Sequence, residues 1–471
     1  NKILGLEVYA DGLIVCSGDG IFFSVDGASW LQINRASVHA SGDNYSTFTG
    51  RSLDARTGQL QSSFALYEGN TDYGQIIICD GVNKPFYFHM EGTGVLNTRT
   101  FFAEEITVTN THAPSTCAVH DHHLVVAGAD AAKDTIYYSH NFEPENFNGA
   151  GAGNIKLSDQ VVGLKSFRDD LIIFCRNSLH KLININDANN IAVVPITQNV
   201  GCLSDHSIQE IGGDLVFLSP DGIRSVAGTS RIGDVELGSV SRQIQSITSA
   251  LAKSIDTYTI TSSVLRSKSQ YRLFYTIDGE SSKVSKGIIG TLAANGFEWA
   301  ETRGIQATGF MSGFDKNGVE QEFHGDLDGY VYNHDIGNSF FENGTAFNID
   351  AQYATPNYDF GDIGTRKTLH YAKISITPEG EVQPTLRVRY DYEDTSIPQP
   401  QDYVLDSVPL PAIFGSAVLG TAIFGASNDP MLRQAIQGSG HSASFRISSV
   451  DQSAPYAING IYINYVPAGR R

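Results

Sequence analysis

The chain has 471 residues, with 51 Asp or Glu against 32 Lys or Arg, so its formal net charge is −19. Such an acidic balance argues against ordinary nucleic-acid binding, in which Lys and Arg displace counterions from phosphates. The length exceeds what one hydrophobic core usually serves, and no apolar run is long enough for a transmembrane helix.

A hairpin pattern recurs along the first two thirds of the chain. In each copy an apolar run is followed by a turn signal, such as Asp80-Gly81 or Asp221-Gly222, and then by a second apolar run. The first runs end at Cys16, Cys79, Ala127, Cys175, Leu218, Thr276 and, more weakly, His324. These ends lie roughly 43 to 63 residues apart, the length of a four-stranded propeller blade. We predict an all-β fold in which residues 1–340 form a β-propeller of about six or seven repeats.

Two stacked β-sandwiches are the alternative, and the regular recurrence of one hairpin favours the propeller. A strand-like pattern begins at Lys2, which predicts that further residues of this domain precede Asn1. The five cysteines contain no C-x-x-C pair and lie mostly in apolar runs, which predicts buried free thiols.

One segment breaks the β pattern. Ile244, Ile247, Leu251 and Ile255 recur at helical spacing, which predicts an amphipathic helix inserted over residues 239–256, with Ser239 or Ser241 as its cap. Because the helix falls between repeats, we expect it on the rim or on one face of the ring.

The repeat stops near residue 340, and a second strand-rich region follows. Apolar and polar residues alternate at 386–390 and 460–465. We predict that residues 345–471 form a C-terminal β-sandwich.

Several motifs could carry chemistry. Residues 24–30 are one residue short of the Asp-box of sialidase-like propellers, and we interpret them as a hairpin turn with Trp30 packed between blades. At most two of the histidines in residues 120–123 could face one metal ion, so a hairpin end is favoured there. Asp326 begins a calcium-like loop that lacks its closing glutamate and is better explained as a turn. Paired acids for glycoside hydrolysis stay possible, but no pair stands out.

The segment 411–427 is apolar, glycine-rich and without any charged residue. It is either a hairpin inside the sandwich core or a contact with another subunit. The candidate interface residues are Ile413, Phe414, Val418, Leu419, Ile423 and Phe424.

Several segments resemble proteins of phage tails. They are residues 137–147, with a strand followed by Ser-x-x-x-x-Pro-x-x-Phe, then 162–174, 199–202, 215–224, the helix from Ser241, and the ending 461–471. The family that they resemble is the tail nozzle of short-tailed bacteriophages, also called tail tubular protein B, which is related in role to packaged-DNA stabilisation (hub) proteins.

The resemblance implies a structural virion protein without catalytic residues, metal or cofactor. It would form a homohexameric ring at the distal end of the tail, assembled in the host cytoplasm, which binds an adaptor (head–tail connector) ring and tail fibres or spikes. Genomic double-stranded DNA would be retained by this ring and would pass through its lumen on ejection, without sequence-specific binding. An acidic lumen would give the duplex no adhesive surface.

Two other classes of function are open. A propeller glycan hydrolase or lyase would need a cleft with converging Arg and carboxylate residues. A carbohydrate-binding propeller would need aromatic side chains on one face, and the chain has only two tryptophans, Trp30 and Trp299.

Overall fold

The computed structural model describes residues 1–18, 20–33, 60–69, 72–92, 100–109, 112–227, 240–294, 296–315, 317–406 and 431–470. The chain divides into two compact units, Asn1–Asp335 and Ile336–Arg471. Each unit has its own hydrophobic core, and the two are described separately.

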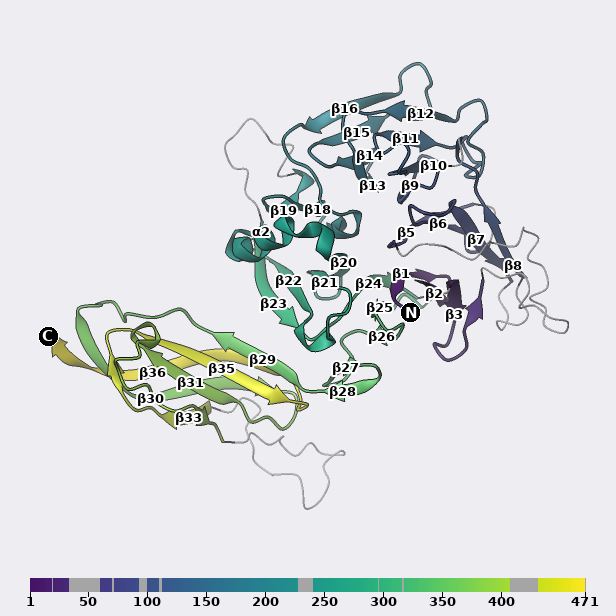
Figure 1. The fold of residues 1–471 in the computed structure, drawn as a ribbon. Helices are drawn as coiled ribbons and strands as arrows, with labels where there is room; N and C mark the ends of the chain where they lie inside the picture. The colour runs from purple at the N-terminus through teal and green to yellow at the C-terminus, as the bar shows by residue number, and fades with distance from the viewer. Residues whose placement is uncertain are drawn as a thin grey trace. The chain divides into compact units, whose positions relative to one another are not determined.

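The first unit is a β-propeller. Its described residues form seven antiparallel sheets, or blades, in chain order, and the first strand of each lies nearest a common axis (Figure 1). Blades 1 to 4 consist of β1 (Ile3–Tyr9), β2 (Gly12–Ser17), β3 (Gly20–Ser24) and β4 (Leu31–Gln32); β5 (Ser63–Tyr67), β6 (Gln75–Cys79), β7 (Phe86–Glu91) and β8 (Thr100–Glu105); β9 (Thr116–His120), β10 (His123–Ala127), β11 (Thr135–Tyr138) and β12 (Gly153–Lys156); β13 (Val161–Phe167), β14 (Asp170–Cys175), β15 (Leu179–Ile183) and β16 (Ala192–Thr197). Blades 5 to 7 consist of β17 (Gln209–Ile211), β18 (Asp214–Ser219) and β19 (Gly222–Ser225); β20 (Thr259–Leu265), β21 (Gln270–Thr276), β22 (Lys286–Ala293) and β23 (Gly296–Arg303); β24 (Gly309–Phe314), β25 (Glu320–Gly325) and β26 (Val331–Asn333).

The recurring apolar run is the second strand of blades 1 to 6, where both of its faces are buried, whereas the second strand of blade 7, β25, is polar and mostly half-buried. In β6, Ile76 and Ile78 join a cluster with the side chains of blade 1, whereas Ile77 and Cys79 join a cluster with those of blade 3. All four side chains are at most 1% exposed. Successive strand residues point to opposite faces, so a strand between two neighbouring blades needs apolar residues at every position.

The ring closes by packing blade 1 against blade 7. Ile3 and Leu6 of β1 share a buried cluster with Met311 of β24. The Ile3 amide donates to the Asp326 carbonyl at 3.0 Å, and the Thr308 hydroxyl donates to the Ile3 carbonyl at 2.7 Å. Similar clusters join each of the other neighbouring pairs of blades.

The α-helix α2 (Gln245–Lys253) lies between blades 5 and 6 in the chain, flanked by the 3-10 turns η5 (Arg242–Ile244) and η6 (Ile255–Thr257). Leu251 is 2% exposed and packs in the cluster that joins blades 5 and 6, together with Ile244. The predicted cap is not formed: the Ser241 hydroxyl accepts a hydrogen bond from the Ile223 amide instead, and Ser239 lies outside the described residues. No helix in the described ranges is long and apolar enough to cross a membrane.

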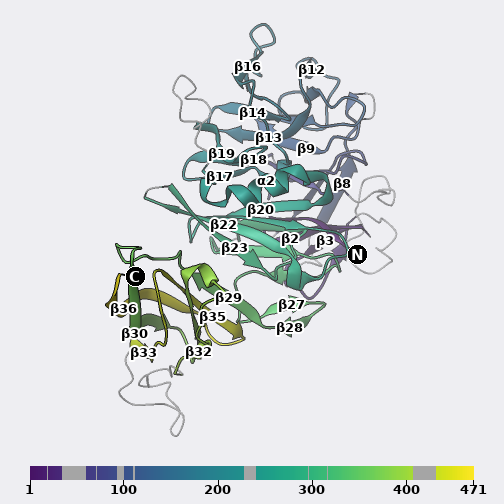
Figure 2. The same cartoon turned by 60° about the vertical axis from the view of Figure 1, so that its left-hand side comes forward.

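The second unit is a β-sandwich that follows a short hairpin of β27 (Phe340–Glu342) and β28 (Thr345–Phe347). One sheet has the order β29-β35-β31-β32, and in the other the long strand β30 pairs with β33, β34 and β36 (Figure 2). The strands are β29 (Ile349–Ala354), β30 (Thr365–Pro378), β31 (Thr385–Tyr390), β32 (Tyr403–Val404), β33 (Met431–Ala435), β34 (Ser439–Gly440), β35 (Ala443–Asp451) and β36 (Tyr456–Arg470). Side chains from both sheets, including Ile374, Val388 and Phe445, form a single buried core.

Candidate functional site

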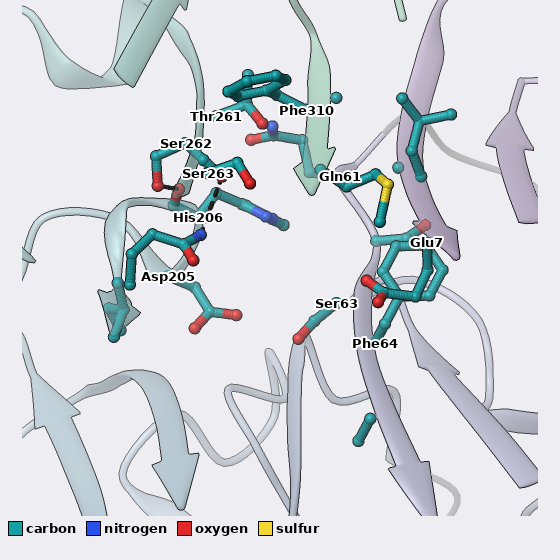
Figure 3. Close-up of a pocket in the computed structure, with 18 of the residues that line it drawn as sticks. Glu7, Gln61, Ser63, Phe64, Asp205, His206, Thr261, Ser262, Ser263 and Phe310 are labelled. Carbon is teal, nitrogen blue, oxygen red and sulfur yellow. Dashed lines mark hydrogen bonds between the residues drawn. The ribbon is translucent and has the colours of Figure 1, made fainter. Parts of the chain in front are cut away.

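The first strands of the blades surround a cavity on the propeller axis. It measures about 450 Å³ and is lined by residues of β1, β5, β9, β13, β20 and β24 and of the segment that leads into β17 (Figure 3). In the described residues each of these strands pairs with a single strand of its own sheet. The unpaired edge of each strand therefore faces the axis, and its free backbone N–H and C=O groups give the cavity a polar wall.

Glycines allow the strands to approach one another around the axis. A Cβ atom at Gly5 would lie 2.7 Å from the ring of Phe64, and one at Gly163 would lie 2.3 Å from an Asp205 carboxylate oxygen. Side chains at these positions would displace blade 2 or the Asp205 carboxylate, so both glycines are required for the observed packing.

Two carboxylates enter the cavity from different blades. Glu7 lies on β1, and Asp205 lies in the 3-10 turn η4 (Asp205–Ser207) that precedes β17. Burial raises the pKa of Glu7 to about 7 and that of Asp205 to about 6, while the charge of Lys165 acts in the opposite direction at both groups. Carboxyl groups with raised pKa values in a cavity are a signature of binding and catalytic sites.

The cavity wall also carries hydroxyl groups. Thr261 and Ser263 of β20 are at most 5% exposed, and no hydrogen bond from either hydroxyl is found within the described part of the chain. Ser262 donates to the His206 carbonyl at 2.6 Å. Burial lowers the pKa of His206 to about 4, so its imidazole is neutral at pH 7.

Gln61 bridges three blades at the end of the cavity where the inner strands begin. Its side-chain amide donates to the carbonyls of Ile260, at 2.7 Å, and Thr308, at 3.1 Å. Gln61 directly precedes the inner part of blade 2, whereas its two acceptors belong to blades 6 and 7. The Gln61 side chain therefore narrows the opening of the cavity at this end.

The arrangement is suited to polar, uncharged ligands. Two carboxyl groups that titrate near neutral pH can both donate and accept hydrogen bonds, and hydroxyl and backbone groups surround them. Within the described ranges no three His, Cys, Asp or Glu side chains are grouped as metal ligands.

A second polar cluster lies between blades 6 and 7. Arg272 of β21 forms a two-point ion pair with Asp335, with N–O distances of 2.8 and 2.7 Å, and Lys268 contacts the same carboxylate. The Nδ1 atoms of His324 and His334 are 3.1 Å apart beside this ion pair. Burial lowers the pKa of His324 to about 3 and that of His334 to about 4, so both are neutral at pH 7.

Motifs singled out in the sequence lie outside the axial cavity. Residues 24–30 form a turn in which Asp26 accepts hydrogen bonds from the amides of Ala28 and Ser29. The expectation that Trp30 packs between blades is wrong, because the side chain is 41% exposed. Its position after the turn places it beyond the buried part of β3 rather than within it.

The histidine-rich segment is the hairpin end between β9 and β10, as the spacing predicted. His120 and His123 face each other across the hairpin, and Asp121 and His122 form the turn with positive φ angles. Hydrogen bonds occupy the rings of both paired histidines, from His120 to Ser166 and from His123 to the Ser139 carbonyl and Asn186.

The Asp326 segment is a turn. The Asp326 carboxylate accepts from the amides of Asp328 and Tyr330 and from the Tyr332 hydroxyl. All five cysteine side chains are buried. The candidate interface residues Ile413, Phe414, Val418, Leu419, Ile423 and Phe424 lie outside the described residues.

Sequence reasoning did not find Glu7 or Asp205. The two are separated in sequence by more than half of the propeller, and only the closed ring brings them to one cavity. The local signal was slight: an acidic residue inside the otherwise apolar pattern of β1.

No protein-family model matches the chain, and no curated protein matches it in sequence. Among solved structures, it is similar to the extracellular domain of a hybrid two component system from B. thetaiotaomicron, with 10% identity and a TM-score of 0.39 over 76% of this chain and 41% of that one. The chain therefore spans about two fifths of the length of that protein. The exo-beta-1,3-galactanase of Phanerochaete chrysosporium is 9% identical with a TM-score of 0.29 over 97% of this chain and 95% of that one. The Pan2 WD40 domain of Neurospora crassa is 8% identical with a TM-score of 0.36 over 72% and 91%. At this distance the similarities carry no argument about activity.

Proposed function

We propose that this chain is the subunit of the tail nozzle ring of a short-tailed bacteriophage. The observation that carries the proposal is the placement of the segments that resemble this family. Residues 137–147, 162–174, 199–202 and 215–224 fall on β11, β13, β14, β18, β19 and the connections between them. They lie in three consecutive blades, 3 to 5, and the two further matches fall on the helix after blade 5 and on β36 of the second unit.

The geometry of the propeller constrains where DNA would pass. A cavity of about 450 Å³ that Gln61 narrows at one end cannot admit a duplex, whose major groove alone is about 12 Å wide. In a nozzle the conduit therefore runs between copies of the chain. With a formal charge of −19 per copy, the walls of such a conduit repel phosphates and let the duplex slide.

In this proposal the chain is a structural virion protein of the tail. Six copies close the distal end of the tail channel, retain the packaged DNA and conduct it on ejection. The ring binds an adaptor ring on one side and carries fibres or spikes.

Electron microscopy of the purified full chain, alone and with a candidate adaptor ring, tests the proposal. Six-fold rings with a central opening, formed alone or on the adaptor, are the expected result. Single propellers under both conditions would contradict it.

A propeller that binds or hydrolyses glycans is the second candidate, and the axial cavity favours it. Glycoside hydrolysis uses a carboxylic acid with a raised pKa together with a second carboxylate, and Glu7 and Asp205 are two such groups in one cavity. Turnover of aryl glycosides by the native chain, lost in both Glu7→Gln and Asp205→Asn, would establish this function. The nozzle proposal predicts no turnover above that of buffer.

A further inference from the structure

One face of the sandwich concentrates cationic and aromatic side chains. On β30, Ala372, Ile374 and Ile376 point into the core and are fully buried, so Tyr371 and Lys373 point outward. The strand register places Lys373 directly opposite Arg433 of β33 on one side and Tyr462 of β36 on the other. We call the row Arg433, Lys373 and Tyr462, together with Tyr371, the basic face.

The two cations of the basic face share one aromatic ring. The Arg433 guanidinium lies 4.5 Å from the centroid of the Tyr371 ring, and the Lys373 ammonium lies 5.8 Å from it. Like charges directly opposite each other on neighbouring strands destabilise a sheet. Contact with the ring offsets part of this repulsion, but it neutralises neither charge.

No carboxylate of the described residues lies within ion-pair distance of Lys373 or Arg433. Two other cations of the same unit, Arg387 and Arg389, are paired, since both contact Asp402, at 2.7 and 3.0 Å. The basic face therefore presents two charges that an external anionic group can neutralise.

The surroundings of the basic face are those of a protein contact. Tyr462 is 59% exposed and Met431 is 53% exposed, and both line a shallow depression of about 300 Å³ with Tyr371 and Lys373. In the part of the chain that the structure describes, β36 pairs with β30 alone, so the strand that carries Tyr462 is an edge of its sheet. Exposed edges and aromatic side chains are both typical of association surfaces.

We propose that the basic face docks on a carboxylate-bearing surface of a second copy of this chain. This inference rests on the proposed ring assembly, and it names the surface that makes the contact. Charge complementarity carries it, because the chain has 51 acidic residues against 32 basic ones, and an acidic surface is what a second copy offers. Nucleic acid is the less suitable occupant, since two cations on a chain of this charge bind a duplex weakly.

The same argument excludes contact of the basic face with itself. A basic face cannot pair with its own copy across a two-fold axis, because that would bring four cations together. The basic face therefore meets a different surface of the neighbour, and a head-to-tail contact supplies such a surface. Head-to-tail contacts close into rings when the rotation permits, as the proposed nozzle requires.

The experiment compares three proteins, each alone and with a candidate adaptor ring, by light scattering over a concentration series at low and high salt. The test variant is Lys373→Glu/Arg433→Glu. The matched control is Lys133→Glu/Lys156→Glu, which makes the same change of charge at two exposed propeller lysines that each already have an aspartate partner. Circular dichroism and thermal unfolding verify that each variant is folded. Binding of a labelled DNA duplex is measured in parallel.

We expect the native chain and the control to associate and the test variant to associate at least about a hundredfold more weakly, with a salt dependence that the variant lacks. Association of the test variant equal to that of the control would overturn the inference and leave the nozzle proposal standing. A native chain that stays monomeric with and without the adaptor ring would overturn both. Duplex binding that is lost in the test variant, with an unchanged mass, would assign the basic face to nucleic acid instead.

Discussion

The ion pair between Arg272 and Asp335 joins blades 6 and 7, and its removal gives a quantitative test of the structure. Arg272 is about 6% exposed and has two hydrogen bonds to the Asp335 carboxylate. Burial alone would raise the pKa of Asp335, but the hydrogen bonds from Arg272 and Lys268 outweigh it and hold that pKa well below its usual range. The Asp335→Ala variant leaves a guanidinium buried without its counter-charge.

Losing one partner of a fully buried pair costs about 3 to 5 kcal/mol. Because Asp335 itself is 30% exposed, we expect about 2 to 4 kcal/mol, reduced for solvent screening. The entropy of unfolding is about 2.1 cal/mol/K per residue, or about 0.7 kcal/mol/K for the propeller unit. The predicted fall in Tm is therefore about 3 to 6 °C by scanning calorimetry.

A matched control is the pair of Lys181 and Asp170, 2.9 Å apart, in which the carboxylate is 33% exposed but the cation is 37% exposed, against 6% for Arg272. Asp170→Ala should cost less than about 1 kcal/mol, which lowers Tm by no more than about 1.5 °C. Adding Arg272→Met to Asp335→Ala should restore part of the lost stability, because it removes the unpaired charge. An equal fall in Tm for Asp335→Ala and Asp170→Ala would refute the reasoning.

Three further predictions concern stability. His324 and His334 have folded pKa values of about 3 and 4 against an ordinary 6.5, so the unfolded chain takes up more protons and stability should fall as pH drops from about 6.5 to 4. Chemical denaturation over this pH range measures the fall. A variant that replaces both imidazole rings should lose the pH dependence. Glu7 has the opposite effect, because its folded pKa of about 7 exceeds the usual 4.5, so its contribution to the free energy of unfolding falls as pH rises from about 4.5 to 7. Between pH 5 and 8 the free energy of unfolding of Glu7→Gln should therefore rise relative to that of the native chain by up to about 3 kcal/mol. A difference between the two proteins that does not change with pH would contradict this. Leu251→Ala should lower the free energy of unfolding, measured in urea, by about 2 to 5 kcal/mol, because it leaves a cavity at a buried position between blades 5 and 6. Ser246→Ala, on the exposed side of α2, should leave that free energy almost unchanged.

Blades 1 to 6 were predictable because each of their second strands contains an unbroken run of mostly apolar residues. A run such as Ile172-Ile173-Phe174-Cys175 splits between two clusters, one with blade 3 and one with blade 5, so neither face can be polar. This requirement repeats in blades 1 to 6 and is visible in the sequence without knowledge of the ring, whereas β25 of blade 7 gives only a weak signal. The helix was predictable for a related reason, since Ile244 and Leu251 face one cluster.

The axial cavity was not predictable from local patterns. Glu7, Lys165 and Asp205 come from three blades, and their proximity depends on closure of the ring. Trp30 shows the converse error: a large apolar residue beside a strand was expected to be buried, but the turn at Asp26 carries it outside the blade interface. The direction of a side chain after a turn depends on register and turn geometry, which the residue type alone does not determine.

The central claim is that this chain works as a ring subunit of a phage tail. The solution mass of the purified chain, measured by light scattering with and without a candidate adaptor ring, tests it most directly. The account predicts a species of six copies, either alone or once the adaptor is present. A stable particle of one copy, 51.0 kDa, that ignores the adaptor at every concentration would contradict it.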